Sequence, residues 1–324
     1  MLVLGHQDLT ALLAPGDVIA AVERAFRECA AGRVAALPRA GLPMGRDGVF
    51  LAMISALPAL RALGTKLATV VEGNRRRGLP TIQATYLLTD PETGTPLALM
   101  EAAFLTAIRT GAASAVAARH LARPESRVIA CFGAGVQARY QLLCLREVLP
   151  LVEVRVVGRG PVRAAKFVRQ MRRELGIPVE LTTDRRAAVQ GADVVTCATT
   201  SPRPVFSGRD LGPGTHVDAV GNFRPTTREV DTVTVRKSRV VVDTYEGAWE
   251  EAGDLLLPIK AGAITRRHVR AELAEVVVGS RPGRTSAREI TLFKSVGFAP
   301  EDAVAARLAY DRALEAGRGV RVDL

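Results

Sequence analysis

Residues 128–138 read VIACFGAGVQA, and this stretch decides the fold. Its first five residues are apolar, as in a buried strand, and they run directly into the turn Gly133-Ala134-Gly135 and a helix that begins near Val136. The first glycine permits a tight turn, the second lets a pyrophosphate approach the backbone, and the small final residue lets helix and strand pack closely. The helix N-terminus then faces the anion. We therefore predict a dinucleotide-binding turn between a strand and a helix.

The chain after this turn alternates apolar strands with helices, a pattern typical of a parallel, doubly wound sheet. One intervening helix has an apolar stripe over residues 164–175. A short strand-like piece at 290–293 leads into an amphipathic helix over 300–316, which we expect to return to the first lobe. The other strands of this sheet are predicted at residues 127–132, 152–157, 179–183, 194–198, 216–220 and 239–243.

The first hundred residues follow a different pattern. A helix begins at Pro15, since proline suits the first helical turn, and its apolar residues recur at helical spacing. A long alanine-rich helix over 101–121 ends this part of the chain. Between the two helices, short turns join strands in what we expect to be an antiparallel meander, at residues 48–55, 63–72, 81–90 and 96–100.

The length of the chain favours two lobes, because 324 residues exceed the roughly 100 to 200 of a single domain. We predict the α/β class, with a Rossmann-type doubly wound parallel sheet over 122–299. A second, α+β lobe is expected from 1–121 together with 300–324. A ligand cleft is expected between the lobes.

The composition excludes several classes of function. The net charge of +11 comes from 44 Lys and Arg that are spread along the chain among 33 acids, and aromatics make up only 4% of residues, so we expect no nucleic acid partner. No apolar run is long enough for a membrane span, and we expect a cytoplasmic protein without a membrane partner. The four cysteines show no metal-binding spacing, and we predict no metal site. The basic balance favours small anionic ligands.

The end of the second predicted Rossmann strand bears on the choice of cofactor. NAD enzymes usually place Asp or Glu there, about 20 residues after the glycines, to bind the ribose 2′-hydroxyl. Here the strand ends in Gly158-Arg159, where a guanidinium favours a 2′-phosphate. We therefore predict NADP(H) over NAD(H). The alternative is that Arg159 is only a solvated loop residue.

Several further motifs occur in a characteristic order. Together with GAGVQA they resemble the ornithine cyclodeaminase and mu-crystallin family, and the resemblance covers nearly the whole chain. The motifs are Arg109-Thr110-Gly111-Ala112, Val220-Gly221, Arg228-Glu229-Val230-Asp231, Gly253-Asp254 and Phe293-Lys294-Ser295-Val296-Gly297.

The resemblance implies a homodimer, and it implies that the first lobe serves both dimerisation and substrate binding. It also implies a small amino or imino acid substrate between the lobes, with its carboxylate held by basic residues. Arg39, Lys66 and Arg109 match those basic residues, and Met53 would line the pocket. The residues expected to bind the cofactor are Thr110, Gly133, Gly135, Val136, Gln137, Ala138, Gly158, Arg159, Thr199, Val220 and Gly221.

The strand pattern around Lys66 agrees with a ligand-binding role. In a strand over 63–72, Lys66 points the same way as Gly64 and Ala68, so a ligand would have space above it. The alternative is an edge-strand lysine that discourages aggregation. Arg109, taken by itself, could equally be an ordinary arginine on a helix surface.

One position departs from the resemblance. Family members that cyclise ornithine look to carry an aspartate two positions after the Val-Gly pair, where it can engage the side-chain amine. This chain has Phe223 there, which cannot pair with an ammonium or activate water. The pattern is more similar to the family's imine reductases and amino-acid dehydrogenases.

The resulting hypothesis is an oxidoreductase that uses NADP(H) to reduce a small 2-imino acid, such as pyrroline- or piperideine-2-carboxylate. Arg39 and Arg109 would clamp the carboxylate, and Lys66 would position or protonate the nitrogen. Three alternatives stay open at this point: an ornithine cyclodeaminase, an alanine-type dehydrogenase, and a protein that binds NADPH and a ligand without turnover.

Overall fold

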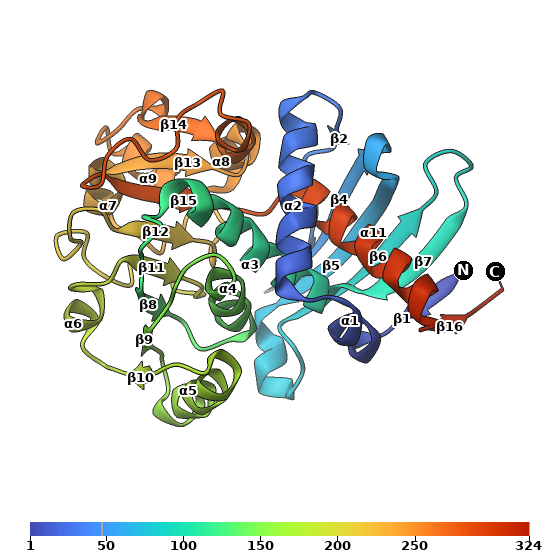
Figure 1. The fold of residues 1–324 in the computed structure, drawn as a ribbon, viewed down its shortest axis with the longest axis horizontal. Helices are drawn as coiled ribbons and strands as arrows, with labels where there is room; N and C mark the ends of the chain where they lie inside the picture. Colours follow the sequence, from blue (N-terminus) through green and yellow to red (C-terminus); the bar gives the residue numbers. More distant parts are fainter. Residues whose placement is uncertain (47, 324) are drawn as a thin grey trace. The chain divides into compact units, whose positions relative to one another are not determined.

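The computed structural model describes residues 1–46 and 48–323 and divides into two compact units (Figure 1). Unit 1 contains residues 1–109 and the chain from Ala299 onward, and unit 2 is Thr110–Phe298. The first boundary falls inside helix α3 (Ala102–Leu121), not at its end as predicted. The reason is packing: Ala118 on the later turns of α3 and Ala122 just beyond it join the hydrophobic core of unit 2.

Unit 1 is built on an eight-stranded sheet, and its central strands form the predicted antiparallel meander. The meander consists of β4 (Gly48–Leu57), β5 (Ala62–Val71), β6 (Ile82–Thr89) and β7 (Pro96–Glu101). Four short strands were not predicted, because two to five residues carry too little periodicity to be recognised. They are β1 (Leu2–Leu4), β2 (Ala35–Ala36), β3 (Ala40–Met44) and β16 (Val320–Arg321).

One face of this sheet is covered by helix α11 (Ala299–Ala316), which lies against β4, β5 and β6 (Figure 1). Its first eight residues are all buried, and its many alanines allow the close approach. Helix α2 (Pro15–Ala30) packs on α11, and the short α1 (His6–Leu12) contacts it as well. This last helix belongs to unit 1, together with the N-terminal part of the chain.

Unit 2 is a doubly wound sheet of eight parallel strands, in the order β10-β9-β8-β11-β12-β15-β13-β14. The predicted α/β class is therefore confirmed. The strands are β8 (Val128–Phe132), β9 (Glu153–Val157), β10 (Val179–Leu181), β11 (Val194–Cys197), β12 (His216–Ala219), β13 (Ser238–Val242), β14 (Val269–Glu272) and β15 (Ile290–Lys294). Of these, β14 was not predicted.

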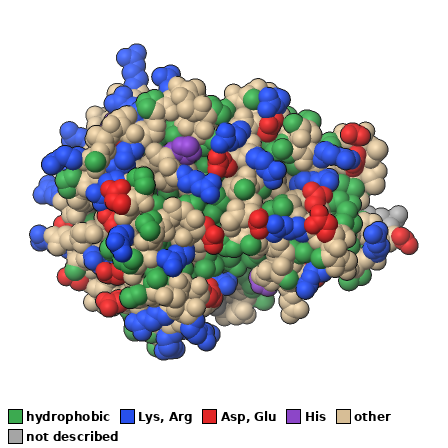
Figure 2. All heavy atoms as spheres, viewed as in Figure 1, with side chains coloured by type: hydrophobic (Ala, Val, Ile, Leu, Met, Phe, Trp, Pro, Cys, Tyr) green, Lys and Arg blue, Asp and Glu red, His purple; other side chains and the backbone are tan. Residues whose placement is uncertain are grey.

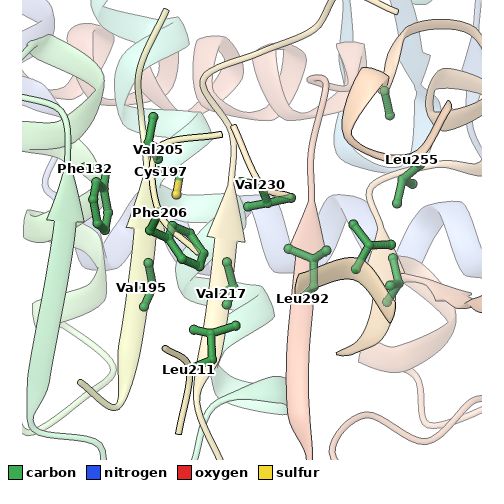
Figure 3. Close-up of a cluster of buried hydrophobic side chains, with 14 of the residues drawn as sticks. Phe132, Val195, Cys197, Val205, Phe206, Leu211, Val217, Val230, Leu255 and Leu292 are labelled. Atoms are coloured by element: carbon green, nitrogen blue, oxygen red, sulfur yellow. The ribbon is translucent and has the colours of Figure 1, made fainter. Parts of the chain in front are cut away.

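Hydrophobic clusters cover both faces of the parallel sheet. Alternate residues of β8 point to opposite sides, so that Ile129 belongs to one cluster and Phe132 to the other. Figure 3 shows the cluster around Phe132, where Val195, Val217 and Leu292 extend from neighbouring strands. Burial of both faces is the usual arrangement for parallel sheets.

The helices of unit 2 connect these strands and supply the other halves of the two clusters. The apolar stripe predicted over 164–175 is buried within α5. The helices are α4 (Val136–Arg146), α5 (Pro161–Leu175), α6 (Arg185–Val189), α7 (Thr232–Lys237), α8 (Tyr245–Glu251), α9 (Gly253–Lys260) and α10 (Leu273–Val277).

Charges of both signs are interspersed on the face of the molecule drawn in Figure 2. Figure 2 shows Lys and Arg side chains scattered over the visible face with acidic side chains among them, and not gathered into one basic patch. Across the described residues, none of the helices has both the length and the apolarity needed to cross a bilayer.

Candidate active site

Four charged side chains meet in a buried cluster in unit 1. The Nζ of Lys66 lies 2.7 Å from Oδ2 of Asp302, and Nε of Arg109 donates to Oδ1 of the same carboxylate at 3.0 Å. The Nη1 of Arg109 also donates to Oε2 of Glu301 at 2.6 Å. All four residues are at most 3% exposed. Two of the three predicted basic residues are thus brought together, with two acids that the sequence analysis did not single out.

The strand register places Lys66 in the middle of a buried row. Met53 on β4 and Tyr86 on β6 are its direct neighbours across the sheet, and all three side chains are buried on one face. The two alternative interpretations are wrong. Lys66 is not on an edge strand, because β5 lies between β4 and β6, and Arg109 is not a helix-surface residue, because it is buried.

The prediction of open space beside Lys66 needs correction. The ring of Tyr86 leans over Gly64, where an added Cβ would lie 2.6 Å from both its Cε1 and its hydroxyl. The backbone carbonyl oxygen of Leu87 would be nearer still, at 2.3 Å, so both the neighbouring backbone and the aromatic side chain require glycine at position 64. The hydroxyl of Tyr86 is buried and makes no hydrogen bond to any residue that the structure describes.

Burial and charge act against each other at Lys66. Burial lowers the pKa of its ammonium, to about 8, since a poorly solvated site disfavours the charged form. Asp302 opposes this change, whereas Arg109 and Arg39 add to it. Burial alone would raise the pKa of Asp302, but Arg109 and Lys66 outweigh it and hold that pKa below its usual value. The cluster therefore contains an ionised carboxylate beside an ammonium that titrates near neutral pH.

Arg39 lies between β2 and β3 and is half-buried. The positive charge of Arg39 repels that of Lys66 and so contributes to lowering the pKa of the Lys66 ammonium. Arg39 thus adds a third cation to the electrostatic surroundings of Lys66, after Arg109 and the Lys66 ammonium itself.

The predicted nucleotide turn has the expected geometry in unit 2. Gly133 has a φ of +125°, and a Cβ there would lie 2.5 Å from the carbonyl oxygen of Ala198, so only glycine fits. Gly135 immediately precedes α4, and the space beside its backbone is open. A Cβ added there would have a guanidinium nitrogen of Arg163 as its nearest neighbour, at 3.7 Å. The first turn of α4 has neither a side-chain cap nor an acidic residue. These residues suit a pyrophosphate.

Two arginines lie near this turn. Arg159 is exposed after the end of β9 and donates from Nη2 to Oγ1 of Thr200 at 3.2 Å. Arg163, on the first turn of α5, has a guanidinium nitrogen 3.7 Å from the position of a Cβ added at Gly135. The sequence analysis did not identify Arg163, although its position four residues after Arg159 places both near the N-terminus of one helix.

The loops after β11 and β12 are tied together by Glu229. Its Oε1 accepts hydrogen bonds from both N and Oγ1 of Thr199 at 2.7 Å, and its Oε2 accepts one from N of Gly221 at 2.6 Å. Burial, and then Asp254, raises the pKa of Glu229 to about 7. Thr199 and Gly221 were both predicted to contact cofactor, and Glu229 holds them side by side at the carboxyl edge of the sheet.

Two further motif residues extend this network. Oδ1 of Asp254 accepts from the backbone N of Glu229 at 2.7 Å, and its Oδ2 lies 3.0 Å from Nζ of Lys294. Lys294 also donates to the carbonyl oxygen of Asn222 at 2.6 Å. No role could be inferred for Asp254 and Lys294 from the sequence, because these two residues and Glu229 are far apart in the chain.

The remaining predicted positions lie as follows. Thr110 accepts a hydrogen bond through its carbonyl oxygen from Gln141 on α4, and Val220 donates from its backbone N to the carbonyl oxygen of Cys197. Ala138 is fully buried in α4, next to the half-buried Gln137. Phe223 packs against the hydrophobic cluster of Figure 3.

The chain matches one known protein family over nearly its whole length. The model of the ornithine cyclodeaminase/mu-crystallin family matches residues 2–317. This chain belongs to that family. The family members to which it is similar include a delta(1)-pyrroline-2-carboxylate reductase from Bacillus cereus, 36% identical over 325 residues, with 100% of each chain covered.

Two solved structures of this family resemble the chain along its whole length. The delta(1)-pyrroline-2-carboxylate reductase of Thermococcus litoralis, in complex with NADH and L-proline, has a TM-score of 0.97 and 44% identity, and the match covers 99% of this chain and 100% of that chain. An archaeal alanine dehydrogenase dimer with bound NAD has a TM-score of 0.94 and 34% identity, with 100% and 99% covered.

Proposed function

We propose that this family member reduces a small cyclic 2-imino acid, such as pyrroline- or piperideine-2-carboxylate, to the corresponding amino acid. The observation behind the proposal is the buried cluster of Lys66 and Arg109 with Asp302, which combines anion-binding groups with a proton donor of suitable pKa. L-Proline, the reduced form of pyrroline-2-carboxylate, is bound by the Thermococcus litoralis relative.

The substrate carboxylate is assigned to Arg109 and Arg39. A guanidinium can hold a carboxylate with two parallel hydrogen bonds, which fixes the plane of the bound acid. Both guanidinium groups carry a positive charge, which complements the negative charge of a substrate carboxylate. Met53, directly beside Lys66 in the sheet, would supply an apolar wall for the ring.

The proton for the imine nitrogen is assigned to Lys66. With a pKa of about 8 its ammonium is mostly protonated at neutral pH, yet it gives up a proton far more readily than an exposed lysine. A bound reduced nicotinamide supplies the hydride for the imine carbon. Addition of one hydride and one proton converts the C=N bond to CH–NH without any other reactant.

The cofactor site is assigned to the turn around Gly133 and Gly135, the N-terminus of α4, and the loop residues Thr199 and Gly221. The relatives above bind NADH or NAD, so a nicotinamide dinucleotide is the ligand class for this family. For this chain we propose a preference for NADP(H), supported by Arg159 at the position where an acid would contact a ribose 2′-hydroxyl. Arg163 adds a second cation close by.

Cyclisation of ornithine is disfavoured by the surroundings of Phe223. Two acids nearby in sequence could have replaced the missing aspartate, but Asp218 is fully buried within β12 against His216, and Glu229 uses both oxygens on Thr199 and Gly221. An ammonium facing a phenyl ring gains roughly 0.5 to 2 kcal/mol, whereas loss of its partner carboxylate in a desolvated site costs about 2 to 5 kcal/mol.

An amino-acid dehydrogenase is the second candidate, because the chain also resembles the archaeal alanine dehydrogenase. The two candidates differ in the source of nitrogen: a dehydrogenase must bind ammonia and a 2-oxo acid separately, and a ketimine reductase receives a preformed C=N bond. The preformed imine is favoured by the similarity to pyrroline-2-carboxylate reductases from Bacillus cereus and Thermococcus litoralis.

The first lobe is also proposed to form a homodimer, and the protein is proposed to act in the cytoplasm. The exposed apolar side chains on the open face of the unit 1 sheet support the dimer. The four cysteines are free thiols, as is usual in a reducing compartment.

The proposed activity is tested by following NADPH and NADH oxidation with a panel of substrates. Pyrroline-2-carboxylate and piperideine-2-carboxylate should be reduced with the highest kcat/KM, and pyruvate with ammonia should react at least tenfold more slowly. Ornithine with catalytic NAD or NADP should release no ammonia. A higher kcat/KM for pyruvate with ammonia would favour the dehydrogenase, and ornithine cyclisation as fast as the best imine reduction would restore the cyclodeaminase.

A further inference from the structure

Asp302 is a buried acid that has no assigned role in binding the substrate. Its carboxylate lies in the first turn of α11, where an acid is also favoured by the helix dipole. A helix-terminal acid with only that role would be exposed to solvent. Asp302 is 1% exposed, and its two oxygens contact two different cations.

We propose that Asp302 is a positioning residue that orients Lys66 and Arg109 for catalysis, with one carboxylate oxygen on each cation. This inference rests on the proposed function, in which Lys66 donates the proton and Arg109 binds the substrate carboxylate. Asp302 itself does not touch the substrate, and it acts through the two cations.

The geometry explains why a bridge is needed. Lys66 is on β5 and Arg109 is on α3, and each side chain has several rotatable bonds that a substrate alone would have to order. Oδ2 of Asp302 holds the ammonium at 2.7 Å, and Oδ1 holds the guanidinium at 3.0 Å. Because both contacts come from one planar group on a buried helix, the distance between the two cations is determined before the substrate binds.

The charges around Lys66 identify Asp302 as the group that keeps it protonated. Glu301 on α11 contacts Arg109, while Arg109 on α3 and Arg39 between β2 and β3 both act to lower the pKa of Lys66. Tyr86 on β6 stays neutral, because burial, and then Asp302, raises its pKa well above the usual value. Against burial and the two guanidinium groups, the Asp302 carboxylate raises the pKa of the Lys66 ammonium.

Removal of this charge should therefore make Lys66 lose its proton at lower pH. Asp302→Asn keeps the shape of the side chain and an oxygen acceptor but not the charge. The alkaline limb of the pH profile of kcat/KM for pyrroline-2-carboxylate reduction should move down by at least about one pH unit. The KM should rise about tenfold as Arg109 loses its bridge, and kcat should recover partly at pH 6.

Glu301→Gln is the matched control, because Glu301 is equally buried, lies on the same turn of α11 and contacts Arg109 through Nη1. Its loss should raise KM but leave the alkaline limb where it is in the wild type. A third variant, Asp302→Glu, keeps the charge and displaces it by one methylene. In Asp302→Glu the alkaline limb should occur at the same pH as in the wild type, while kcat falls and KM rises. Wild-type kcat and KM in Asp302→Glu would contradict the positioning role.

A direct titration of Lys66 gives an answer even if the enzyme proves inactive on cyclic imino acids. The full chain has few lysines, so NMR of protein labelled with ¹³C at the lysine ε position is tractable, and Lys66→Met assigns the signal. The signals come from Lys66, Lys166, Lys237, Lys260 and Lys294.

The pKa of Lys66 measured in this way should be lower in Asp302→Asn than in the wild type and nearly unchanged in Glu301→Gln. Equal pKa values in Asp302→Asn and wild type would overturn the proposal. Lack of turnover of any cyclic imino acid by the wild type would overturn the proposed function and leave the titration as a separate test of the bridge. If Asp302→Asn does not fold, the kinetics of Asp302→Glu decide the positioning role.

Discussion

At the scale of single residues, Lys66 combines two opposing requirements. A general acid must be protonated at the working pH and yet release its proton easily, and the competition between burial and Asp302 places the pKa of Lys66 at about 8. An exposed lysine would satisfy the first requirement alone. Burial in the row with Met53 and Tyr86, together with the Asp302 carboxylate, thus accounts for the acidity of the Lys66 ammonium.

The pH dependence of the reaction should follow from this pKa. In the proposed mechanism reduction needs the protonated ammonium, so kcat/KM should fall as pH rises through about 8, whereas oxidation of the amino acid needs the free amine and should gain over the same range.

Lys66→Ala should lower kcat by at least about 10²-fold and leave the Kd for NADPH unchanged. Steady-state profiles and fluorescence titrations would measure both effects. Lys260→Ala, at an exposed lysine, is the control, and more than about a tenth of wild-type kcat in Lys66→Ala would exclude the role.

The proposed preference for NADP(H) also depends on individual residues. One charge-assisted hydrogen bond is worth roughly ten- to a hundredfold in affinity, so Arg159→Ala should weaken NADPH by about that factor and leave NADH nearly unchanged. Arg163→Ala should show a smaller effect in the same direction. Arg169→Ala, an exposed arginine farther along α5, serves as the control. Equal kcat/KM for the two cofactors in the wild type would refute the preference.

At the scale of elements, the approach of β5 to β6 depends on Gly64. An added methyl group would overlap the backbone carbonyl oxygen of Leu87 as well as the ring and hydroxyl of Tyr86, and this buried position has no free volume for it. The position shows how one strand is shaped by the side chain of its neighbour, since the pairing of Lys66 with Tyr86 directs the tyrosine ring across the strand.

Gly64→Ala should therefore destabilise the protein by about 1 to 3 kcal/mol and lower kcat as Tyr86 is displaced beside Lys66. Chemical denaturation and steady-state kinetics would measure the two effects. Gly212→Ala is a suitable control, because the nearest atom to an added Cβ is 3.9 Å away and the backbone is not left-handed there. A stable Gly64→Ala variant with normal kcat would show that the space above β5 is not filled in solution.

At the scale of the whole molecule, the sheet of unit 1 has one face covered by α11 and another that exposes apolar side chains. Ile54, Leu67 and Leu87 are each 37–40% exposed on this second face, on three adjacent strands. A contiguous apolar face of this kind marks an interaction surface in most proteins. A second copy of the chain is the proposed occupant, in keeping with the dimer described for the archaeal alanine dehydrogenase.

The dimer should be disrupted by charges on that face. The wild type should have the mass of a dimer in light scattering at micromolar concentration, and a Leu67→Glu, Leu87→Glu double variant should be monomeric because buried charges in a self-complementary interface repel. Val162→Glu, at a residue 83% exposed on α5, should remain dimeric. A monomeric wild type would remove the basis for the proposed interface.

The sequence by itself determined those features whose causes are contiguous in the chain. The turn at Gly133 is set by local backbone conformation and close packing, and the helix over 164–175 by the spacing of its apolar side chains. The same local patterns located most strands of both units. Short strands such as β1, and β14 with its four residues, lacked enough periodicity to be recognised.

Only the tertiary structure decided which charges meet. Asp302 is 236 residues from Lys66, and Glu229 joins Thr199 to Gly221 across two loops. The order of strands was likewise hidden, since β15 inserts between β12 and β13. Propensity and periodicity act over a few residues, whereas the pKa of a buried ammonium depends on whatever the fold places within a few ångströms. The pKa of Lys66 is therefore set by the folded structure around it and not by the sequence of its own strand.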